Sequence, residues 1–190
     1  MSSETTNPII LLAQPNSAIS EAYRNLRAAV SKQLVQDRRS FSIVSAWMGD
    51  GKSMVCTNLA TAISQLHLKV LLIDGDLRRP TISRVFSAQT LPGFTECLEG
   101  GDILLGYRTR FENLEIMPRG LSKTNPANLL NLQCLQRVMD HWKSHYDAII
   151  LDTPPLSVCS DALLLGSQTD AAVMVVSPKG WDGETEQRFK

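Results

Sequence analysis

The sequence lacks the cysteine spacing that marks a zinc site or a redox centre. Its four cysteines form no Cys-x-x-Cys pair; they are Cys56, Cys97, Cys134 and Cys159. Scattered cysteines in a mid-sized chain are typical of small buried side chains in a reducing compartment. His141 and His145 lie four residues apart, a spacing that can chelate a metal ion, but no third ligand is near them. We therefore expect no metal site at these histidines.

The chain also lacks an excess of charge of either sign. Its 19 Lys and Arg residues balance 19 Asp and Glu residues, so we expect no nucleic-acid partner. No apolar stretch approaches the roughly 20 residues that span a bilayer. The N-terminal residues 1–10 have neither the basic region nor the long apolar run of a signal peptide. We therefore expect a cytoplasmic protein.

What the chain does contain is an alternation of apolar runs and helical stretches. Residues 9–12, followed by Pro15, predict an extended arm or short strand and then a turn. From Ile19, apolar residues at three- and four-residue spacing predict a helix, and a second helix is expected over residues 52–66. Five apolar runs predict buried strands, at residues 41–46, 70–73, 114–117, 148–151 and 171–176. This alternation predicts an α/β fold with a doubly wound, mostly parallel sheet and helices on both faces.

A phosphate-binding loop is the sharpest local signal. Residues 46–53, AWMGDGKS, follow the first predicted strand and fit the relaxed P-loop pattern [AG]-x4-G-K-[ST], which predicts a P-loop NTPase fold. Glycines let backbone N–H groups converge on phosphates, and Lys52 supplies a cation. The Ser53 hydroxyl can ligate Mg2+. The expected nucleotide-binding residues are Met48, Gly49, Asp50, Gly51, Lys52, Ser53 and Met54.

Carboxylates follow two further predicted strands. Asp74 and Asp76 come directly after the strand at 70–73, and Asp152 follows the strand at 148–151. In open α/β sheets, ligands bind at the carboxyl ends of the strands, so these groups are expected near the P-loop. Asp152 is interpreted as a Mg2+ carboxylate, and Asp74 and Asp76 as groups that orient the metal's waters or accept a proton. The alternative for each is a helix cap or a turn.

Seven segments, in this order and spacing, resemble the bacterial tyrosine kinases of capsule and exopolysaccharide export. This family belongs to the deviant P-loop ATPase superfamily, together with chromosome-partitioning and division-site ATPases. Position 47 is a lysine in the partitioning and division-site ATPases and Trp47 here, which favours the kinase branch. The segments are EAYRNLR (21–27), the P-loop (46–53), VLLIDGDLRRP (70–80), GF with LEG (93–94, 98–100), NPANLL (125–130), YDAIILDTPP (146–155) and SDA (160–162).

The resemblance implies roles for individual residues. Lys52, Asp74, Asp76 and Asp152 would be catalytic, and Ser53, Asp74 and Asp152 would hold the metal of Mg-ATP. Residues 21–27 would mediate a ring-shaped oligomer through Glu21, Arg24 and Arg27. Their spacing places these three on one side of a helix, although intrahelical Glu–Arg pairs on a solvated face explain the same spacing.

The resemblance further implies an ATP-dependent protein-tyrosine autokinase, with slow ATPase activity, that regulates polysaccharide polymerisation and export. Its expected partners are further copies of itself and a membrane-anchored polysaccharide co-polymerase, which would recruit this cytoplasmic chain to the inner face of the membrane. The alternatives are a non-catalytic ATP-binding regulator of the exporter and a partitioning or positioning ATPase.

The resemblance also bears on domain organisation and on the acceptor. We expect residues 1–190 to form a single P-loop kinase domain that lacks the family's C-terminal helix, strand and tyrosine-rich tail. The only tyrosines are Tyr23, Tyr107 and Tyr146. Tyr23 lies on the apolar stripe of a predicted helix and Tyr146 abuts a predicted strand, so we expect both to be packed. Tyr107 is the one expected to be exposed.

Two further features near the predicted site have open interpretations. Arg78 and Arg79 follow Asp76 and would either contact phosphate or a neighbouring subunit, or pair with surface carboxylates. Trp47 would either stack on a base or pack against the edge of the sheet, and packing is favoured because the P-loop lies at the phosphates.

Overall fold

The fold is built on one six-stranded sheet. A computed structural model describes residues 9–177, and the strands lie in the order β3-β4-β2-β5-β1-β6. All neighbouring strands are parallel apart from β3, which runs antiparallel to β4. The mostly parallel α/β sheet predicted from the sequence is therefore confirmed. The strands are Ser40–Ser45 (β1), Val70–Asp74 (β2), Tyr107–Arg108 (β3), Leu114–Met117 (β4), Ala148–Asp152 (β5) and Ala171–Val175 (β6).

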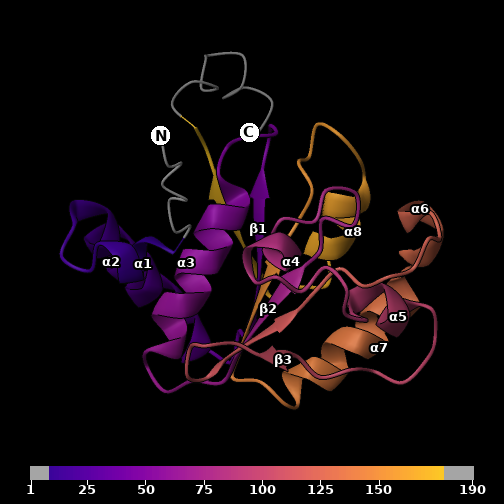
Figure 1. Cartoon of the computed structure of the whole chain (residues 1–190), viewed down its shortest axis with the longest axis horizontal. Helices are drawn as coiled ribbons and strands as arrows, with labels where there is room; N and C mark the ends of the chain where they lie inside the picture. The colour runs from indigo at the N-terminus through magenta and orange to yellow at the C-terminus, as the bar shows by residue number, and fades with distance from the viewer. Residues whose placement is uncertain (1–8, 178–190) are drawn as a thin grey trace.

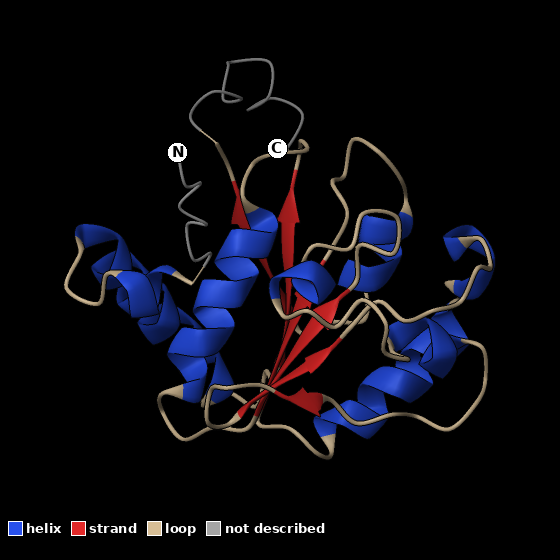
Figure 2. Cartoon of the chain, viewed as in Figure 1, coloured by secondary structure: helices blue, strands red, loops and turns tan. Residues whose placement is uncertain are grey.

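Helices cover both faces of this sheet (Figures 1 and 2). Leu71 and Ile73 of β2 enter one apolar cluster with α5, α7 and α8, whereas Val70 and Leu72 enter another with α2, α3 and α4. The alternation follows from the two-residue period of a strand. The helices are Ile10–Ala13 (α1), Ala18–Leu34 (α2), Lys52–Ser64 (α3), Ile82–Val85 (α4), Phe94–Leu98 (α5), Pro126–Leu129 (α6), Leu132–Lys143 (α7) and Asp161–Gly166 (α8).

The five predicted strands form at the predicted places. Their bounds differ from the apolar runs by at most one residue at either end. In the ladder, Asp74 of β2 pairs in register with Asp152 of β5, and Ile43 of β1 also pairs with Asp152. The carboxyl ends of the three central strands therefore meet at one edge of the sheet. The two-residue strand β3 was not predicted, because it is too short to carry an apolar alternation.

The first described segment differs from its prediction. Residues 9–12 were expected to form an extended arm or a short strand, and this is wrong, because Ile10–Ala13 form the single helical turn α1. The backbone N–H groups of Ile10 and Leu11 donate to Oδ1 of Asn58 on α3, at 2.8 and 3.4 Å. Leu11 is buried. The turn is held by a side chain distant in sequence, which local propensity does not reveal.

The helix predicted from residue 19 is present as α2. Ser17 is its N-cap, and its Oγ accepts a hydrogen bond from the backbone N–H of Ser20 at 3.2 Å. Tyr23 and Val30 are buried along the apolar stripe, while Ile19 stays half-exposed. α2 packs on α3, which places it one layer away from the sheet. Across residues 9–177, no helix combines the length and apolar character needed to cross a membrane.

Candidate nucleotide-binding site

The predicted P-loop connects β1 to α3 and has the backbone that its glycines require. Gly49 and Gly51 have φ values of 91° and 94°, in a region that other residues rarely adopt. The carboxylate of Asp50 folds back, and its Oδ2 accepts a hydrogen bond from the backbone N–H of Trp47 at 3.0 Å. The loop ends where α3 begins, at Lys52, so its backbone N–H groups and the positive end of α3 face the same space.

Lys52 lies beneath this loop rather than in solvent. Its side chain is buried, and Nζ donates a hydrogen bond of 3.0 Å to Oγ of Ser45. The Ser45 hydroxyl in turn donates to the carbonyl oxygen of Trp47 at 2.8 Å. No carboxylate within residues 9–177 forms an ion pair with this ammonium. A buried cation that forms no ion pair is suited to binding an anion, although its charge also partly offsets the rise in the pKa of Asp152 that burial causes.

Asp152 and Ser53 meet directly under the P-loop. The Ser53 hydroxyl donates a hydrogen bond of 2.5 Å to Oδ2 of Asp152, and the Cys56 thiol lies 3.5 Å from Oδ1. Burial raises the pKa of Asp152 to about 7; the bond from Ser53 lowers it in part, and the charge of Asp74 raises it again. The two residues predicted to hold the metal are therefore adjacent, and their carboxyl group is costly to ionise until a cation arrives.

Asp74 is fully buried behind Asp152. Its Oδ2 accepts two hydrogen bonds from Ser83, one from the backbone N–H at 2.7 Å and one from the hydroxyl at 2.6 Å. Its Oδ1 is buried and has no hydrogen-bond partner. Burial raises the pKa of Asp74 to about 6, against the opposing effect of the Ser83 bonds. An unsatisfied buried oxygen of this kind is suited to a metal-bound water.

Asp76 combines both interpretations made from the sequence. Its Oδ1 accepts hydrogen bonds from the backbone N–H groups of Arg78 and Arg79, at 3.2 and 2.9 Å, which is the turn interpretation. Its side chain is nevertheless half-buried and lines a cleft beside the P-loop. The structure thus separates the predicted carboxylates into two at the sheet edge, Asp74 and Asp152, and one in the cleft wall.

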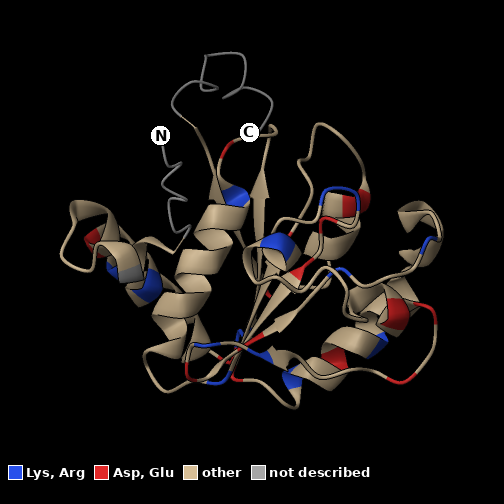
Figure 3. Ribbon diagram, viewed as in Figure 1, with Lys and Arg blue, Asp and Glu red and all other residues tan. Residues whose placement is uncertain are grey.

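The cleft has a volume of about 680 Å³ and three walls. The P-loop wall contains Lys52 and Ser53, and a second wall is formed by the segment after β2 together with α4. Figure 3 shows basic segments at the start of α3 and on α4. The segment after β5 forms the third wall. Apart from the P-loop, the lining residues are Asp76, Arg78, Arg79, Thr81, Arg84, Pro154, Pro155 and Val158.

These residues fit a magnesium ion held together with phosphate. Residues 9–177 include no group of three or more His, Cys, Asp or Glu side chains that could hold a metal ion unaided. Mg2+ does not need such a cage, since it is commonly bound by one or two carboxylates, waters and substrate phosphates. Ser53, Asp152 and the unpartnered Oδ1 of Asp74 supply that smaller set. The fold and the site together define a P-loop nucleotide-binding protein.

Comparison with known proteins gives the family. The chain belongs to the AAA domain family, which matches residues 39–181, and within it to the bacterial tyrosine-protein kinases. It is 34% identical to tyrosine-protein kinase YwqD of Bacillus subtilis, over 94% of this chain and 75% of that protein. It is 30% identical to tyrosine-protein kinase ptk of Acinetobacter johnsonii, but there it spans only 23% of the relative.

Solved structures agree with this assignment. The kinase domain of the Escherichia coli tyrosine kinase ETK superposes with a TM-score of 0.86 at 29% identity, over 96% of this chain and 72% of that one. The septum site-determining protein MinD of Pyrococcus horikoshii, solved with Mg-ADP, gives a TM-score of 0.64 at 30% identity, over 74% and 58%. Both the predicted fold class and the predicted family are confirmed.

The predicted oligomer residues lie on α2, away from the cleft. Arg24 pairs with Glu21 at 2.7 Å, the intrahelical pair considered as the alternative, and also donates to the carbonyl oxygen of Pro15 at 2.5 Å. Arg27 reaches back to α3 and donates to the carbonyl oxygen of Ala62 at 3.1 Å. The three side chains therefore do not present one uniform outward face, because Arg27 bonds within the subunit.

The structure shows the contacts of the two arginines, the tryptophan and the histidine pair that were considered in the sequence. Arg78 forms a 3.0 Å ion pair with Asp161, as the surface-pair interpretation expects, whereas Arg79 Nη1 lies 2.6 Å from Sδ of Met48. Trp47 is 44% exposed, so it is only partly covered, and packing against the edge of the sheet stays a prediction. His141 and His145 were predicted not to hold a metal ion. Nδ1 of His145 lies 2.8 Å from the carbonyl oxygen of His141.

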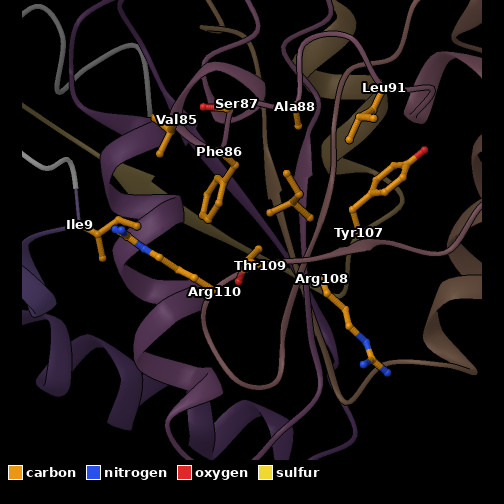
Figure 4. A pocket seen from close by; sticks show the side chains of 11 residues that line it. Ile9, Val85, Phe86, Ser87, Ala88, Leu91, Tyr107, Arg108, Thr109 and Arg110 are labelled. Carbon is orange, nitrogen blue, oxygen red and sulfur yellow. The ribbon is translucent and has the colours of Figure 1, made fainter.

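A second cavity, of about 370 Å³, lies beside α4 and β3 (Figure 4). Its wall includes Phe86, Tyr107, Arg108 and Arg110. Tyr107 was expected to be exposed and is half-buried instead, because it packs on the apolar cluster that contains β2 and α3. Tyr107 is not among the residues that line the P-loop cleft.

Several residues of the site were not predicted from the sequence. Ser45 and Ser83 hold Lys52 and Asp74, and Arg84 lines the cleft. A hydroxyl residue at the end of β1, and another in the helix after β2, were visible but ambiguous, since serine is common in both contexts. The sequence pattern finds strand ends, whereas these contacts depend on how α4 sits over them.

Proposed function

We propose that this chain is a Mg-ATP-dependent protein-tyrosine autokinase that regulates the polymerisation and export of a capsular polysaccharide or exopolysaccharide. The observation that carries the proposal is the Ser53–Asp152 pair beneath the P-loop, in a chain whose relatives are named tyrosine-protein kinases. That pair is the part of the site that a nucleotide-bound Mg2+ requires.

In this proposal the P-loop binds the phosphates of ATP. The backbone N–H groups of residues 48–54 surround them, and Lys52 adds a cation that forms no ion pair with a carboxylate of residues 9–177. Ser53 and Asp152 would hold Mg2+, with Asp74 behind them as a second carboxylate for its waters. Bound Mg2+ would neutralise charge that develops on the phosphates.

Phosphoryl transfer then needs an acceptor and a group that takes the proton. A tyrosine hydroxyl in the cleft forms a bond to the γ-phosphorus, the bond from that phosphorus to ADP breaks, and the hydroxyl proton leaves. Asp76 lines the cleft and has one oxygen, Oδ2, outside the turn bonds made by Oδ1, so it is our candidate to take that proton. Most of the acceleration in such reactions comes from positioning and charge stabilisation.

The proposal includes partners. A membrane-anchored polysaccharide co-polymerase would bring this chain to the inner face of the cell membrane, where copies of it would assemble through Glu21, Arg24 and Arg27. A solved relative is entitled the chimerical protein CapA2B2, which is consistent with a chain of this type working beside a second protein. The acceptor tyrosine would come from a neighbouring copy, because Tyr107 lies outside the cleft lining.

A direct test supplies the acceptor separately. The full chain would be incubated with Mg-ATP and a tyrosine-rich peptide, and phosphotyrosine on the peptide would be measured by mass spectrometry. Transfer that requires Mg2+ is the expected result. Nucleotide binding and hydrolysis without transfer, with the membrane partner present, would instead support a non-catalytic regulator or a positioning ATPase.

Lys52→Met provides the matched negative variant. Hydrogen bonds to charged groups are worth about 1.5–3 kcal/mol, so we expect affinity for Mg-ATP to fall roughly ten- to a hundredfold in calorimetry. Lys123→Met, at an exposed position outside the cleft lining, should bind nucleotide as the wild type does. Equal affinity in both variants would remove the P-loop assignment.

A further inference from the structure

Arg79 and Arg84 are two exposed cations in the lining of the cleft beside the P-loop. Neither forms an ion pair with any carboxylate of residues 9–177. Arg84 donates only to neutral oxygens, the Pro80 carbonyl at 3.0 Å and Thr81 Oγ1 at 3.2 Å. Their neighbour Arg78 differs, since it is already paired with Asp161.

The charge of the cleft exceeds what the P-loop alone explains. Its lining holds four cationic side chains and the single carboxylate Asp76. Lys52 belongs to the P-loop, whereas Arg79 and Arg84 come from the segment after β2 and from α4, and Nη1 of Arg79 lies 2.6 Å from Sδ of Met48 at the edge of the P-loop. A substrate that approaches the bound phosphate from the open side of the cleft therefore passes the two unpaired arginines. Such a wall raises the local concentration of anionic segments and disfavours cationic ones.

The third wall of the cleft is apolar. Pro154 and Pro155 line it together with Val158, whose side chain is 58% exposed. An aromatic ring packs well on such a surface. The same cleft thus offers both an apolar contact for a ring and guanidinium groups whose planar fork matches carboxylates.

We propose that Arg79 and Arg84 select the acceptor, favouring a tyrosine that is flanked in its own chain by aspartate or glutamate. This inference rests on the proposed kinase function and names the substrate class for it. Exposed charge pairs are weak, so each arginine should contribute about a two- to fivefold preference for acidic over neutral flanks. The two together give roughly a four- to twenty-five-fold preference if their effects are independent.

The test compares two fluorescent peptides of equal length, each with a central tyrosine, one flanked by glutamate and the other by glutamine. Binding to the full chain in the presence of Mg-ADP is measured by anisotropy, and kcat/KM for phosphorylation is measured with Mg-ATP. The wild type should prefer the glutamate peptide in both assays. In Arg79→Gln/Arg84→Gln the preference should fall to within about twofold, with binding of the glutamine peptide unchanged. Arg38→Gln is the control: an exposed arginine outside the cleft lining, hydrogen-bonded to Gln33, which should keep the full preference.

Several outcomes would overturn the inference. The first is equal binding of the two peptides by the wild type. The second is a preference for the glutamate peptide that persists in the double variant, and the third is an equal loss of binding affinity for both peptides in that variant. A drop in Mg-ADP affinity of the double variant would show that the arginines serve the nucleotide and would also overturn it. Phosphorylation of both peptides at the same rate would leave the kinase assignment standing while removing this specificity. No phosphorylation of either peptide, with binding preference intact, would remove the kinase assignment instead.

Discussion

Asp152 is a carboxyl group that the fold makes difficult to ionise. It lies at the meeting point of β5, α3 and the P-loop, is buried, and has a pKa raised to about 7 by that burial. The same burial favours metal binding, because electrostatic attraction to a divalent cation offsets the desolvation penalty of the carboxylate. The buried carboxylate thus lowers the stability of the protein without a metal ion, and it strengthens binding of the metal ion when one is present.

The pH dependence of stability follows from the raised pKa of Asp152. Its folded-state pKa lies above the ordinary 3.8, so its contribution to stability is present below about pH 4 and is lost as pH rises towards 7. Asp152→Asn removes this titration. We expect the variant to be more stable than the wild type by roughly 2–4 kcal/mol at pH 8, and by little at pH 4.5, in urea unfolding without Mg2+ or nucleotide.

Asp170 provides the opposite control. It accepts hydrogen bonds from the backbone N–H groups of Arg39 and Ser40 and forms an ion pair with Lys143 at 2.7 Å. These contacts hold the pKa of Asp170 below its usual value despite partial burial. Its contribution is present above about pH 4 and is lost as pH falls through the lowered pKa. Asp170→Asn should therefore be less stable than the wild type at pH 8. A destabilised Asp152→Asn or a stabilised Asp170→Asn at this pH would contradict the assignment of that residue.

At the scale of single elements, the two arginines of α2 are expected to contribute differently to the stability of the fold. Arg24 bonds to Glu21 and Pro15 on or beside its own helix, whereas Arg27 ties α2 to α3 through the Ala62 carbonyl oxygen. We expect Arg24→Ala to change the free energy of unfolding by less than about 0.5 kcal/mol, because such helix pairs are weak. Arg27→Ala should cost about 1 kcal/mol, since it breaks a hydrogen bond between helices.

The same variants test the proposed assembly. Sedimentation velocity of the double variant Arg24→Ala/Arg27→Ala should show smaller particles than the wild type, provided that urea unfolding first shows it to be folded. A wild type that stays monomeric even with its membrane partner would remove the interface assignment, and the pairs within the subunit would then account for both arginines.

The junction of β2 and β5 depends on Gly75. Its backbone N–H donates to the carbonyl oxygen of Asp152 at 3.0 Å. A Cβ at this position would collide with that carbonyl oxygen and lie 2.8 Å from Cδ1 of Leu151. Gly75→Ala should therefore cost about 1–3 kcal/mol in urea unfolding, as overpacking generally does, and should also weaken Mg-nucleotide binding. At Gly101 an added methyl group would lie 3.7 Å from its nearest neighbour, an ordinary contact distance, so Gly101→Ala should be close to neutral.

Helices and strands were predicted correctly where the sequence pattern within the element itself determines its structure. Buried parallel strands such as β2 and β5 are continuous apolar runs, so the sequence alone indicates them. α1 was predicted wrongly because its turn is held by Asn58 on another helix. The strand ends predicted the positions of Asp74 and Asp152, but the Ser83 and Ser45 contacts depend on tertiary packing, which periodicity does not report.

At the scale of the whole molecule, few tyrosine hydroxyls are available for phosphorylation. Tyr23 and Tyr146 are buried, as predicted, and the Tyr146 hydroxyl donates to Glu115 at 2.6 Å and accepts from the Gly106 N–H at 2.8 Å. We expect the chain to hydrolyse ATP slowly. After incubation with Mg-ATP, mass spectrometry should find phosphotyrosine either absent or confined to Tyr107. Abundant phosphate on Tyr23 or Tyr146 would contradict the packing described for them.

Helix α3 is buried along most of its length, with every residue from 56 to 64 enclosed between the sheet and neighbouring helices. A helix held in this way has no room to tilt or rotate when a nucleotide arrives or is hydrolysed. We therefore expect a signal from the P-loop to a partner to travel through the surface loops after β2 and β5, and the Arg78–Asp161 pair connects the first of these loops to the start of α8. Amide hydrogen exchange rates should therefore stay the same in α3 when nucleotide binds, whereas the rates in these two loops should change.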